Sequence, residues 1–292
     1  MTWKRVATAL VLIPVVVGLV LFASTAVVAV ATAVITVLAL WEYFALGEAI
    51  GHRAYRVWTI FCSVLFVFSG LVGVGTGGFL GNRPETWTFP SLTIPFNGIF
   101  ASELLFLFVL GLAVLTLWTR RPLVEALPAA GISASAMLLV AFPLSFAVRL
   151  HNGPPVWGPR LLLFALVITW AGDTAAYFVG RAMGRHPLAP HISPKKTWEG
   201  SVGSMVGSLI VAWGFSYWLR IPLGHLVAMA VIGNVAGQMG DLMESAYKRS
   251  AGVKDSGGLL PGHGGVLDRI DALILCIPVI WYYLVLVNPV AL

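Results

Sequence analysis

The sequence predicts an all-α fold: a polytopic integral membrane protein with about nine transmembrane helices and a cytoplasmic N-terminus. Of its 292 residues, 59% are hydrophobic and only 10% are charged, whereas a soluble domain has roughly 45–50% apolar residues. The apolar residues form long runs, and a helix needs roughly 20 such residues to cross a bilayer. The expected spans are residues 6–22, 24–46, 57–76, 100–118, 127–149, 160–181, 199–219, 222–247 and 268–288.

The order of the spans follows from where the apolar runs begin and end. Residues 1–23 look like a secretory signal, with Lys4 and Arg5 ahead of an apolar run, but a second run over 26–46 follows at once. We therefore expect the first run to remain as a membrane anchor. The segment 77–99, rich in Gly, Pro and Thr, interrupts the apolar pattern and is expected outside the membrane, on the external side.

The lysines and arginines indicate the orientation of the spans, because cytoplasmic loops carry an excess of them. With the N-terminus in the cytoplasm, fourteen of the 18 basic residues fall on that side. The exceptions are Arg83, Arg149, Arg160 and Arg220. This orientation places the loops 182–198 and 248–267 in the cytoplasm. It also accounts for most of the net charge of +6, so we expect a lipid bilayer and no nucleic acid as a partner.

Cysteine and histidine usage argues against a disulfide and against a zinc centre. Cys62 and Cys276 each lie in an apolar run, where a free cysteine behaves as a small hydrophobe. The six histidines never approach the spacing of zinc ligands. A hard metal ion with oxygen ligands suits the acids of this chain better.

The acids divide the chain into an N-terminal transmembrane scaffold, residues 1–160, and a C-terminal catalytic transmembrane region, residues 161–292. The scaffold spans are almost purely apolar, and Glu42 is the main acid well inside one of them. A carboxylate at the bilayer centre costs roughly 2.5–3.5 kcal/mol, so acids in the second region should face a wet cavity lined by protein. Seven of the 12 acids lie there: Asp173, Glu199, Asp241, Glu244, Asp255, Asp268 and Asp271.

The predicted helix 222–247 carries polar side chains at steps of three or four, which places them on one face. They are Asn234, Gln238, Asp241, Ser245 and Lys248. Asn234 and Gln238 either join helices or line a site, and both interpretations stay open. For Asp241 a functional role is favoured, and Glu244 either pairs with Lys248 or supports a metal site. A neighbouring face carries small residues that allow another helix to approach closely: Gly233, Gly237 and Gly240.

The loop that follows, residues 249–266, carries six glycines and one proline. Glycine permits unusual backbone angles, so successive N–H groups, including those of Gly264 and Gly265, can form an anion-binding nest. The basic side chains beside the loop suit phosphate. They are Lys248, Arg249 and Lys254. His263 is interpreted as a hydrogen-bond donor to phosphate, with a simple turn residue as the alternative.

Carboxylates on either side of this loop predict a metal site. Asp268 and Asp271 stand three residues apart at the start of the last span, near the positive end of a helix. With Asp241 they offer the oxygen ligands of a magnesium ion shared with substrate phosphates, although Asp268 alone would also suit a helix cap. Asp173, isolated in the span 160–181, either completes the metal set or pairs with a base such as Lys196.

A second phosphate site is predicted just before the helix 199–219. Its residues are Ser193, Lys195, Lys196 and Thr197. Cations and hydroxyl groups next to a helix N-terminus bind anions readily. The alternative is the ordinary positive charge of a cytoplasmic loop. The sequence lacks a Walker-type phosphate loop, so a P-loop nucleotide pump is not expected.

The segment 245–271 resembles the signature of the CDP-diacylglycerol synthases, also called phosphatidate cytidylyltransferases. That signature runs Ser, Lys-Arg, Lys-Asp, His-Gly-Gly, Asp-Arg and Asp. Here it is met by Ser245, Lys248-Arg249, Lys254-Asp255, His263-Gly264-Gly265, Asp268-Arg269 and Asp271. Residues 172–177 and 193–200 also look like elements of that family, so the resemblance extends over roughly 170–271.

The resemblance implies an enzyme that transfers CMP from CTP to phosphatidate, giving CDP-diacylglycerol and pyrophosphate for phospholipid biosynthesis. It implies Mg²⁺ (or Mn²⁺) as cofactor, a homodimer, and an active site open to the cytoplasm. The compact chain favours a bacterial plasma (inner) membrane. The residues expected to act in catalysis are Asp241, Lys248, Arg249, Lys254, Asp268 and Asp271. The expected metal ligands are Asp241, Asp268, Asp271 and Asp173.

The sequence leaves two alternative functions. A CDP-alcohol phosphotransferase also combines membrane helices with aspartates, but its Asp-Gly-x-x-Ala-Arg motif is missing here. A cation-coupled transporter would explain buried acids such as Asp173 and Asp241. A transporter would not explain why the loop 249–266 is basic and rich in glycine.

Overall fold

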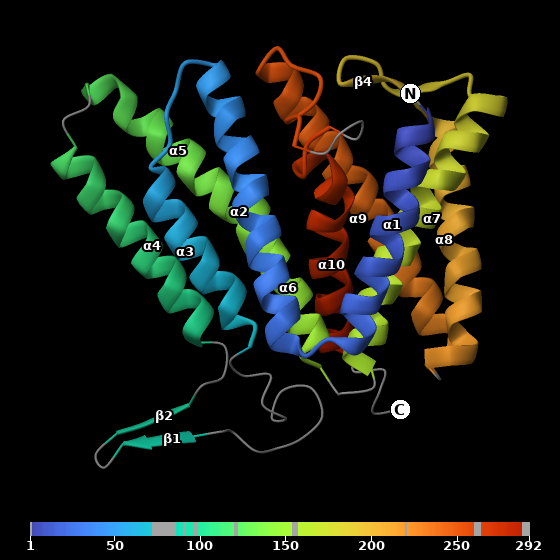
Figure 1. The fold of residues 1–292 in the computed structure, drawn as a ribbon, viewed down its shortest axis with the longest axis horizontal. Helices are drawn as coiled ribbons and strands as arrows, with labels where there is room; N and C mark the ends of the chain where they lie inside the picture. The colour runs from blue at the N-terminus through green and yellow to red at the C-terminus, as the bar shows by residue number, and fades with distance from the viewer. Residues whose placement is uncertain are drawn as a thin grey trace.

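Long helices running along one axis build almost the whole structure (Figure 1). The structure is a computed structural model that describes residues 2–71, 86–89, 92–95, 99–119, 122–153, 157–219, 221–259 and 264–287. The helices are α1 (Thr2–Phe22), α2 (Thr25–Ala49), α3 (Arg56–Ser69), α4 (Ile99–Trp118), α5 (Ala126–Ala136), α6 (Phe142–His151), α7 (Trp157–Met183), α8 (Trp198–Leu219), α9 (Leu223–Ser250) and α10 (Leu267–Val287).

Two short antiparallel hairpins are the only sheets in the described part of the chain. One pairs β1 (Thr86–Phe89) with β2 (Leu92–Pro95), and the other pairs β3 (Pro187–Ala189) with β4 (Ser193–Thr197). The predicted all-α class is therefore confirmed. The segment 182–198, predicted as a cytoplasmic loop, is largely the β3–β4 hairpin.

Seven helical segments of the described chain are long and apolar enough to cross a membrane. One of them, Leu123–His151, joins α5 to α6 through a π-helical turn, Met137–Ala141. That wide turn ends two residues before Pro143, which lacks the N–H of a regular helix. The apolar part of α1 and the helix α3 are shorter. The multi-span architecture is confirmed, whereas the count of nine crossings stays a prediction.

Close packing of α7, α8, α9 and α10 builds the C-terminal part of the bundle. The contact between α7 and α8 is close because Gly207 of α8 faces the carbonyl oxygen of Ala171, 2.9 Å from where a Cβ would stand. Gly240 of α9 lies against the backbone of Asp271 in α10, and Gly233 against Ile280. The predicted small-residue face of α9 is confirmed, and its neighbour is α10.

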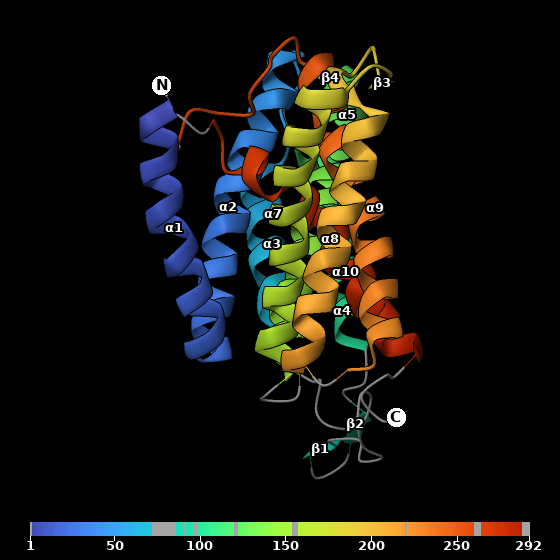
Figure 2. The same ribbon diagram turned by 90° about the vertical axis from the view of Figure 1, so that its right-hand side faces the viewer.

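The main hydrophobic core joins helices from both ends of the chain. It contains Leu40 and Phe44 of α2, Phe146 of α6, Phe164 of α7 and Ile277 of α10, all nearly inaccessible to solvent. A smaller core lies between α3, α4 and α5. Figure 2 shows α1 standing at the side of the bundle. The packing thus links α2 and α6 to the C-terminal helices, while the boundary between residues 160 and 161 stays a prediction.

The two ends of the bundle carry different connections. Figure 1 shows the N-terminus, the β3–β4 hairpin and the α9–α10 connection at one end, and the β1–β2 hairpin at the other. The two loops that were predicted to share the cytoplasmic side therefore share one end of the protein.

Candidate active site

A cavity of about 470 Å³ opens between α7, α8, α9 and the β3–β4 hairpin. Its charged lining residues are Asp173, Arg181, Lys195, Lys196 and Asp241. Tyr177, Thr197, Ser201 and Gln238 are among its polar residues. Two carboxylates and three cations therefore surround one space, which is the setting that a polyanion with a shared cation requires.

The β3–β4 hairpin holds the two lysines of the cavity in place. The Thr197 hydroxyl accepts a 3.1 Å hydrogen bond from the Gly200 N–H, so Thr197, which was predicted as a phosphate ligand, caps the first turn of α8. Glu199 accepts hydrogen bonds from the backbone N–H groups of Arg185 and His186, and it pairs with the His186 ring at 2.5 Å. The start of the hairpin, just before β3, is thus fastened to the first turn of α8.

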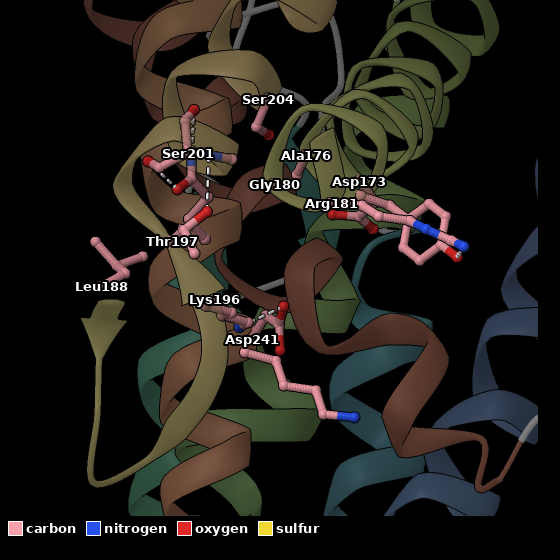
Figure 3. Close-up of a pocket in the computed structure, with 14 residues that line it drawn as sticks. Asp173, Ala176, Gly180, Arg181, Leu188, Lys196, Thr197, Ser201, Ser204 and Asp241 are labelled. Atoms are coloured by element: carbon pink, nitrogen blue, oxygen red, sulfur yellow. Dashed lines mark hydrogen bonds and ion pairs between the residues drawn. The ribbon is translucent and has the colours of Figure 1, made fainter. Parts of the chain in front are cut away.

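Lys196 and Asp241 form an ion pair inside the cavity. The Lys196 Nζ lies 2.5 Å from Asp241 Oδ2, and Figure 3 shows the two side chains pointing toward each other. Ser245 donates a longer hydrogen bond, 3.5 Å, to Asp241 Oδ1. Asp173 lines the same cavity and interacts electrostatically with both Lys196 and Asp241. The structure therefore brings together three of the predicted site residues, from α7, β4 and α9.

Asn234 and Gln238 join α9 to α8. The Asn234 amide donates 2.8 Å hydrogen bonds to the hydroxyls of Ser204 and Ser208. Gln238 donates to Asn234 Oδ1 at 2.6 Å and accepts from Ser201 at 2.5 Å. For the buried Asn234 the helix-joining interpretation is therefore supported. Gln238 belongs to the same chain of hydrogen bonds and also lines the cavity.

Lys248 lies in a buried ion cluster beside the cavity. Its Nζ contacts Glu244 one turn earlier on α9 and lies 2.6 Å from Asp268 Oδ1 on α10. All three side chains are at most 10% exposed. Neither Lys248 nor Asp268 is among the described residues that line the cavity of Asp241. Glu244 pairs with Lys248, which was one of its two predicted roles.

Backbone N–H groups occupy the remaining oxygen of Asp268. Asp268 Oδ2 accepts hydrogen bonds from Gly265 N at 2.8 Å and Ser256 N at 3.1 Å. Gly264 adopts a φ of +80° at this point, a left-handed conformation that favours glycine. The N–H of Gly265, predicted to bind phosphate, is thus directed to an acid of the protein itself.

Asp271 is a predicted metal ligand on α10. Its Oδ1 accepts a 2.7 Å hydrogen bond from the Ala272 N–H. Its carboxyl also interacts electrostatically with Asp241 and Asp173. Within the described residues, however, no group of three His, Cys, Asp or Glu side chains is close enough to hold a metal ion alone.

The remaining predicted phosphate ligands lie at different places in the protein. Arg249 donates to the carbonyl oxygens of Ile192 and Val253, at 3.2 and 3.1 Å, and so ties the hairpin to the end of α9. Lys254 is exposed on the α9–α10 connection, and Ser193 begins β4 without lining the cavity. His263 lies outside the described residues.

Some residues at or near the cavity were not predicted. Arg181 lines it and donates a 3.0 Å hydrogen bond to the Tyr177 hydroxyl. The signal was present, because Asp173, Tyr177 and Arg181 follow one another at four-residue steps on one helix face. Glu42, which was assigned to the scaffold, contacts the α9–α10 connection through Ser256. Nothing in the sequence around Glu42 indicates this contact.

Fold and site together define a polytopic membrane protein with a phosphate-suited cavity near one end of its helices. Comparison with known proteins names its family: the chain matches the cytidylyltransferase family over residues 3–287 and belongs to it. Two relatives, both named phosphatidate cytidylyltransferase, come from Haemophilus influenzae and Bacillus subtilis. The first is 38% identical over 172 residues, covering 57% of this chain and 59% of the relative. The second is 37% identical over 179 residues, covering 60% and 66%.

A third relative of the same name, from Staphylococcus saprophyticus, is 47% identical over 125 residues, covering 42% of this chain and 48% of the relative. The chain thus aligns with between about half and two thirds of the length of these relatives.

Proposed function

We propose that this protein is a phosphatidate cytidylyltransferase that transfers CMP from CTP to phosphatidate. The observation that carries the proposal is the cavity in which Lys195, Lys196 and Arg181 surround Asp173 and Asp241. The family membership and the names of the relatives support the same activity. The products would be CDP-diacylglycerol and pyrophosphate.

The reaction needs positioning and charge neutralisation more than a strong base. A phosphate oxygen of phosphatidate, already anionic, attacks the α-phosphorus of CTP. A new phosphorus–oxygen bond forms, and the bond from the α-phosphorus to the oxygen that bridges to the β-phosphate breaks. The electron pair leaves with pyrophosphate. Fixed cations around the reacting phosphates lower the barrier of such a step because they are oriented before the charge moves.

Lys195, Lys196 and Arg181 are the cations proposed to hold the phosphates. They reach the cavity from β4 and from α7, so the triphosphate would lie between these two elements. When a phosphate takes Lys196, the Asp241 carboxylate is released from its ion pair. Asp241 would then be available to a metal ion at the same time as the substrate arrives.

The donor set fits a divalent ion that shares its ligands with substrate. Mg²⁺ is commonly held by one or two carboxylates together with phosphates and water. Asp173 and Asp241 line the cavity, and Asp271 interacts electrostatically with both. Asp268 fits less well, because Lys248 and backbone N–H groups already occupy its oxygens. When bound, Mg²⁺ (or Mn²⁺) would neutralise charge on the phosphates.

The proposal includes a homodimer in a plasma membrane, with the cavity facing the cytoplasm. The fourteen-to-four distribution of basic residues in the sequence supports this orientation. Gly258 is exposed on the α9–α10 connection, while Cys62 and Cys276 are buried. A Gly258→Cys protein should therefore react with an impermeant maleimide in inverted vesicles and not in right-side-out cells. The mass of the protein in lipid nanodiscs tests the dimer.

The decisive experiment follows labelled CTP into lipid. Purified protein with phosphatidic acid and Mg²⁺ should convert α-³²P-CTP into a chloroform-soluble product and release pyrophosphate in equal amount. EDTA should stop the reaction, and diacylglycerol should not replace phosphatidic acid. Transfer of label from CDP-diacylglycerol to a free alcohol, or cation flux without transfer of CMP, would replace this proposal with a phosphotransferase or a transporter.

A further inference from the structure

Glu42 is a buried carboxylate held entirely by hydrogen bonds from the α9–α10 connection. It lies in α2 and is 3% exposed. Its oxygens accept from Ser256 Oγ at 2.9 Å, Val266 N at 3.0 Å and Leu267 N at 2.8 Å. None of the ion pairs found in the described part of the chain includes Glu42. A buried carboxylate without such donors would be strongly unfavourable, so this set of donors has to stay in place around it.

Two glycines of the connection lie so close to this carboxylate that a side chain would have no room. A Cβ on Gly257 would stand 2.5 Å from Glu42 Oε1, and a Cβ on Gly265 would overlap Glu42 Oε2. The connection also ends at the first residue of α10, Leu267, where the helix dipole favours an anion. The glycine-rich segment therefore does form an anion-binding backbone, and the anion that it encloses is Glu42.

Ser256 extends the contact from Glu42 to the ion cluster. Its hydroxyl donates to Glu42, while its N–H donates to Asp268 Oδ2 at 3.1 Å. Asp268 Oδ1 in turn accepts from Lys248 at 2.6 Å. A continuous hydrogen-bonded chain thus runs from α2 to α9. On the way this chain passes through Asp268 of α10. Helices α9 and α10 carry the acids near the cavity, because Asp241 lies on α9 and Asp271 on α10.

We propose that Glu42 is a positioning residue of the active site. This inference rests on the proposed transfer of CMP. Glu42 sets where α10 begins and where Asp268 meets Lys248, and so it determines how α9 and α10 present Asp241 and Asp271 to the cavity. It touches no substrate. Its effect on turnover therefore runs through the connection, and it acts together with Ser256.

The test compares Glu42→Gln and Ser256→Ala with a control in the same helix, Glu48→Gln. Glu48 is partly exposed and pairs with Arg56 at 2.6 Å. In Glu42→Gln, the amide NH₂ meets backbone donors, so hydrogen exchange of the segment 256–267 should rise by about 10-fold or more. The kcat per folded molecule should fall on the order of 10-fold or more, because small displacements of reacting groups are costly. The KM for CTP should stay nearly unchanged, since the cavity cations are untouched.

Ser256→Ala keeps two of the three donors to Glu42, and we expect it to fold even where Glu42→Gln does not. It should raise hydrogen exchange over 256–267 and lower kcat, in each case by less than Glu42→Gln does. Because both residues act along one path, the double variant should be no worse than Glu42→Gln alone. Fully additive losses would mean two independent structural defects and would overturn the proposal.

Two further outcomes also overturn it: unchanged exchange over 256–267 in both variants, or raised exchange with kcat intact. The exchange measurement needs no substrate. If the wild-type protein fails to transfer CMP, the proposed function falls by itself, while the exchange data still decide whether Glu42 holds the connection.

Discussion

The ammonium group of Lys196 and the carboxylate of Asp241 are in direct contact, 2.5 Å apart, although they come from a surface hairpin and a membrane helix. Their side chains are 27% and 31% exposed and line the cavity, while the Lys196 Nζ itself is buried. A partly exposed ion pair contributes on the order of 1 kcal/mol to stability. A substrate phosphate can therefore replace Asp241 at Lys196, and a metal ion can replace Lys196 at Asp241.

Replacing Lys196 by glutamine should reduce activity without unfolding the protein. Loss of one fixed charge at a reacting phosphate costs on the order of 100-fold in turnover, so kcat/KM for CTP should fall by about that factor. The thermal midpoint should change little, because both side chains of the pair are partly exposed and the glutamine amide can still donate to Asp241. Arg185→Gln removes a positive charge from the same connection outside the cavity lining and should leave kinetics nearly unchanged. Equal losses in both variants would indicate a general effect of loop charge.

Replacing Asp241 by asparagine should change the metal requirement. An amide is a weaker ligand for a hard cation than a carboxylate, and the Mg²⁺ concentration for half-maximal turnover should rise by roughly 10-fold or more. A Mg²⁺ titration of the initial rate at saturating CTP measures this. Glu48→Gln, an acid-to-amide change at a residue that does not line the cavity, serves as the control. If the Mg²⁺ titration curve of Asp241→Asn overlays that of the wild type, Asp241 is not a metal ligand.

Replacing Asp268 by asparagine should chiefly affect stability. Asp268 is one of two carboxylate partners of the buried Lys248, and Glu244 is the other. Breaking a buried ion pair from one side costs about 3–5 kcal/mol, and the remaining pair with Glu244 should reduce this cost. Thermal unfolding in detergent should therefore show a much lower midpoint for Asp268→Asn than for Asp241→Asn. A normal midpoint combined with a shifted Mg²⁺ requirement would instead assign Asp268 to the metal, as its place in the family signature suggested.

Hydropathy was sufficient to predict most of the helices. The span expected over 160–181 is α7, Trp157–Met183, and that expected over 199–219 is α8, Trp198–Leu219. A long apolar run leaves the chain few alternatives in a membrane, since every backbone group must be hydrogen-bonded internally. The β3–β4 hairpin was missed because its strands are short and lack an alternating apolar pattern.

Helix periodicity also predicted which polar residues share the cavity. Gln238 and Asp241 were predicted on one face of α9, and both line the cavity. The same four-residue spacing places Asp173 and Tyr177 on one face of α7, and both line the cavity too. Contacts between distant segments could not be read in this way. Glu42 and Ser256 are 214 positions apart, and no local pattern connects them. The glycines suggested an enclosed anion, but only the fold identifies that anion as a side chain of α2.

The contact between α7 and α8 offers a test of the packing that frames the cavity. A Cβ on Gly207 would lie 2.9 Å from both the Ala171 carbonyl oxygen and the Ala175 Cβ, and backbone atoms cannot move aside cheaply. Gly207→Ala should therefore destabilise the protein by ~1–3 kcal/mol, as overpacking of a tight interface does.

Gly214→Ala is the matched control for that substitution, on the same helix. Nothing lies within 4 Å of a Cβ at Gly214, and alanine favours the helix by roughly 0.5–1 kcal/mol over glycine. The midpoint of thermal unfolding should fall for Gly207→Ala and stay level or rise for Gly214→Ala. Because the same helices line the cavity, Gly207→Ala should also raise the KM for CTP. Equal midpoints for the two variants would mean that α7 and α8 pack less closely than the structure has them.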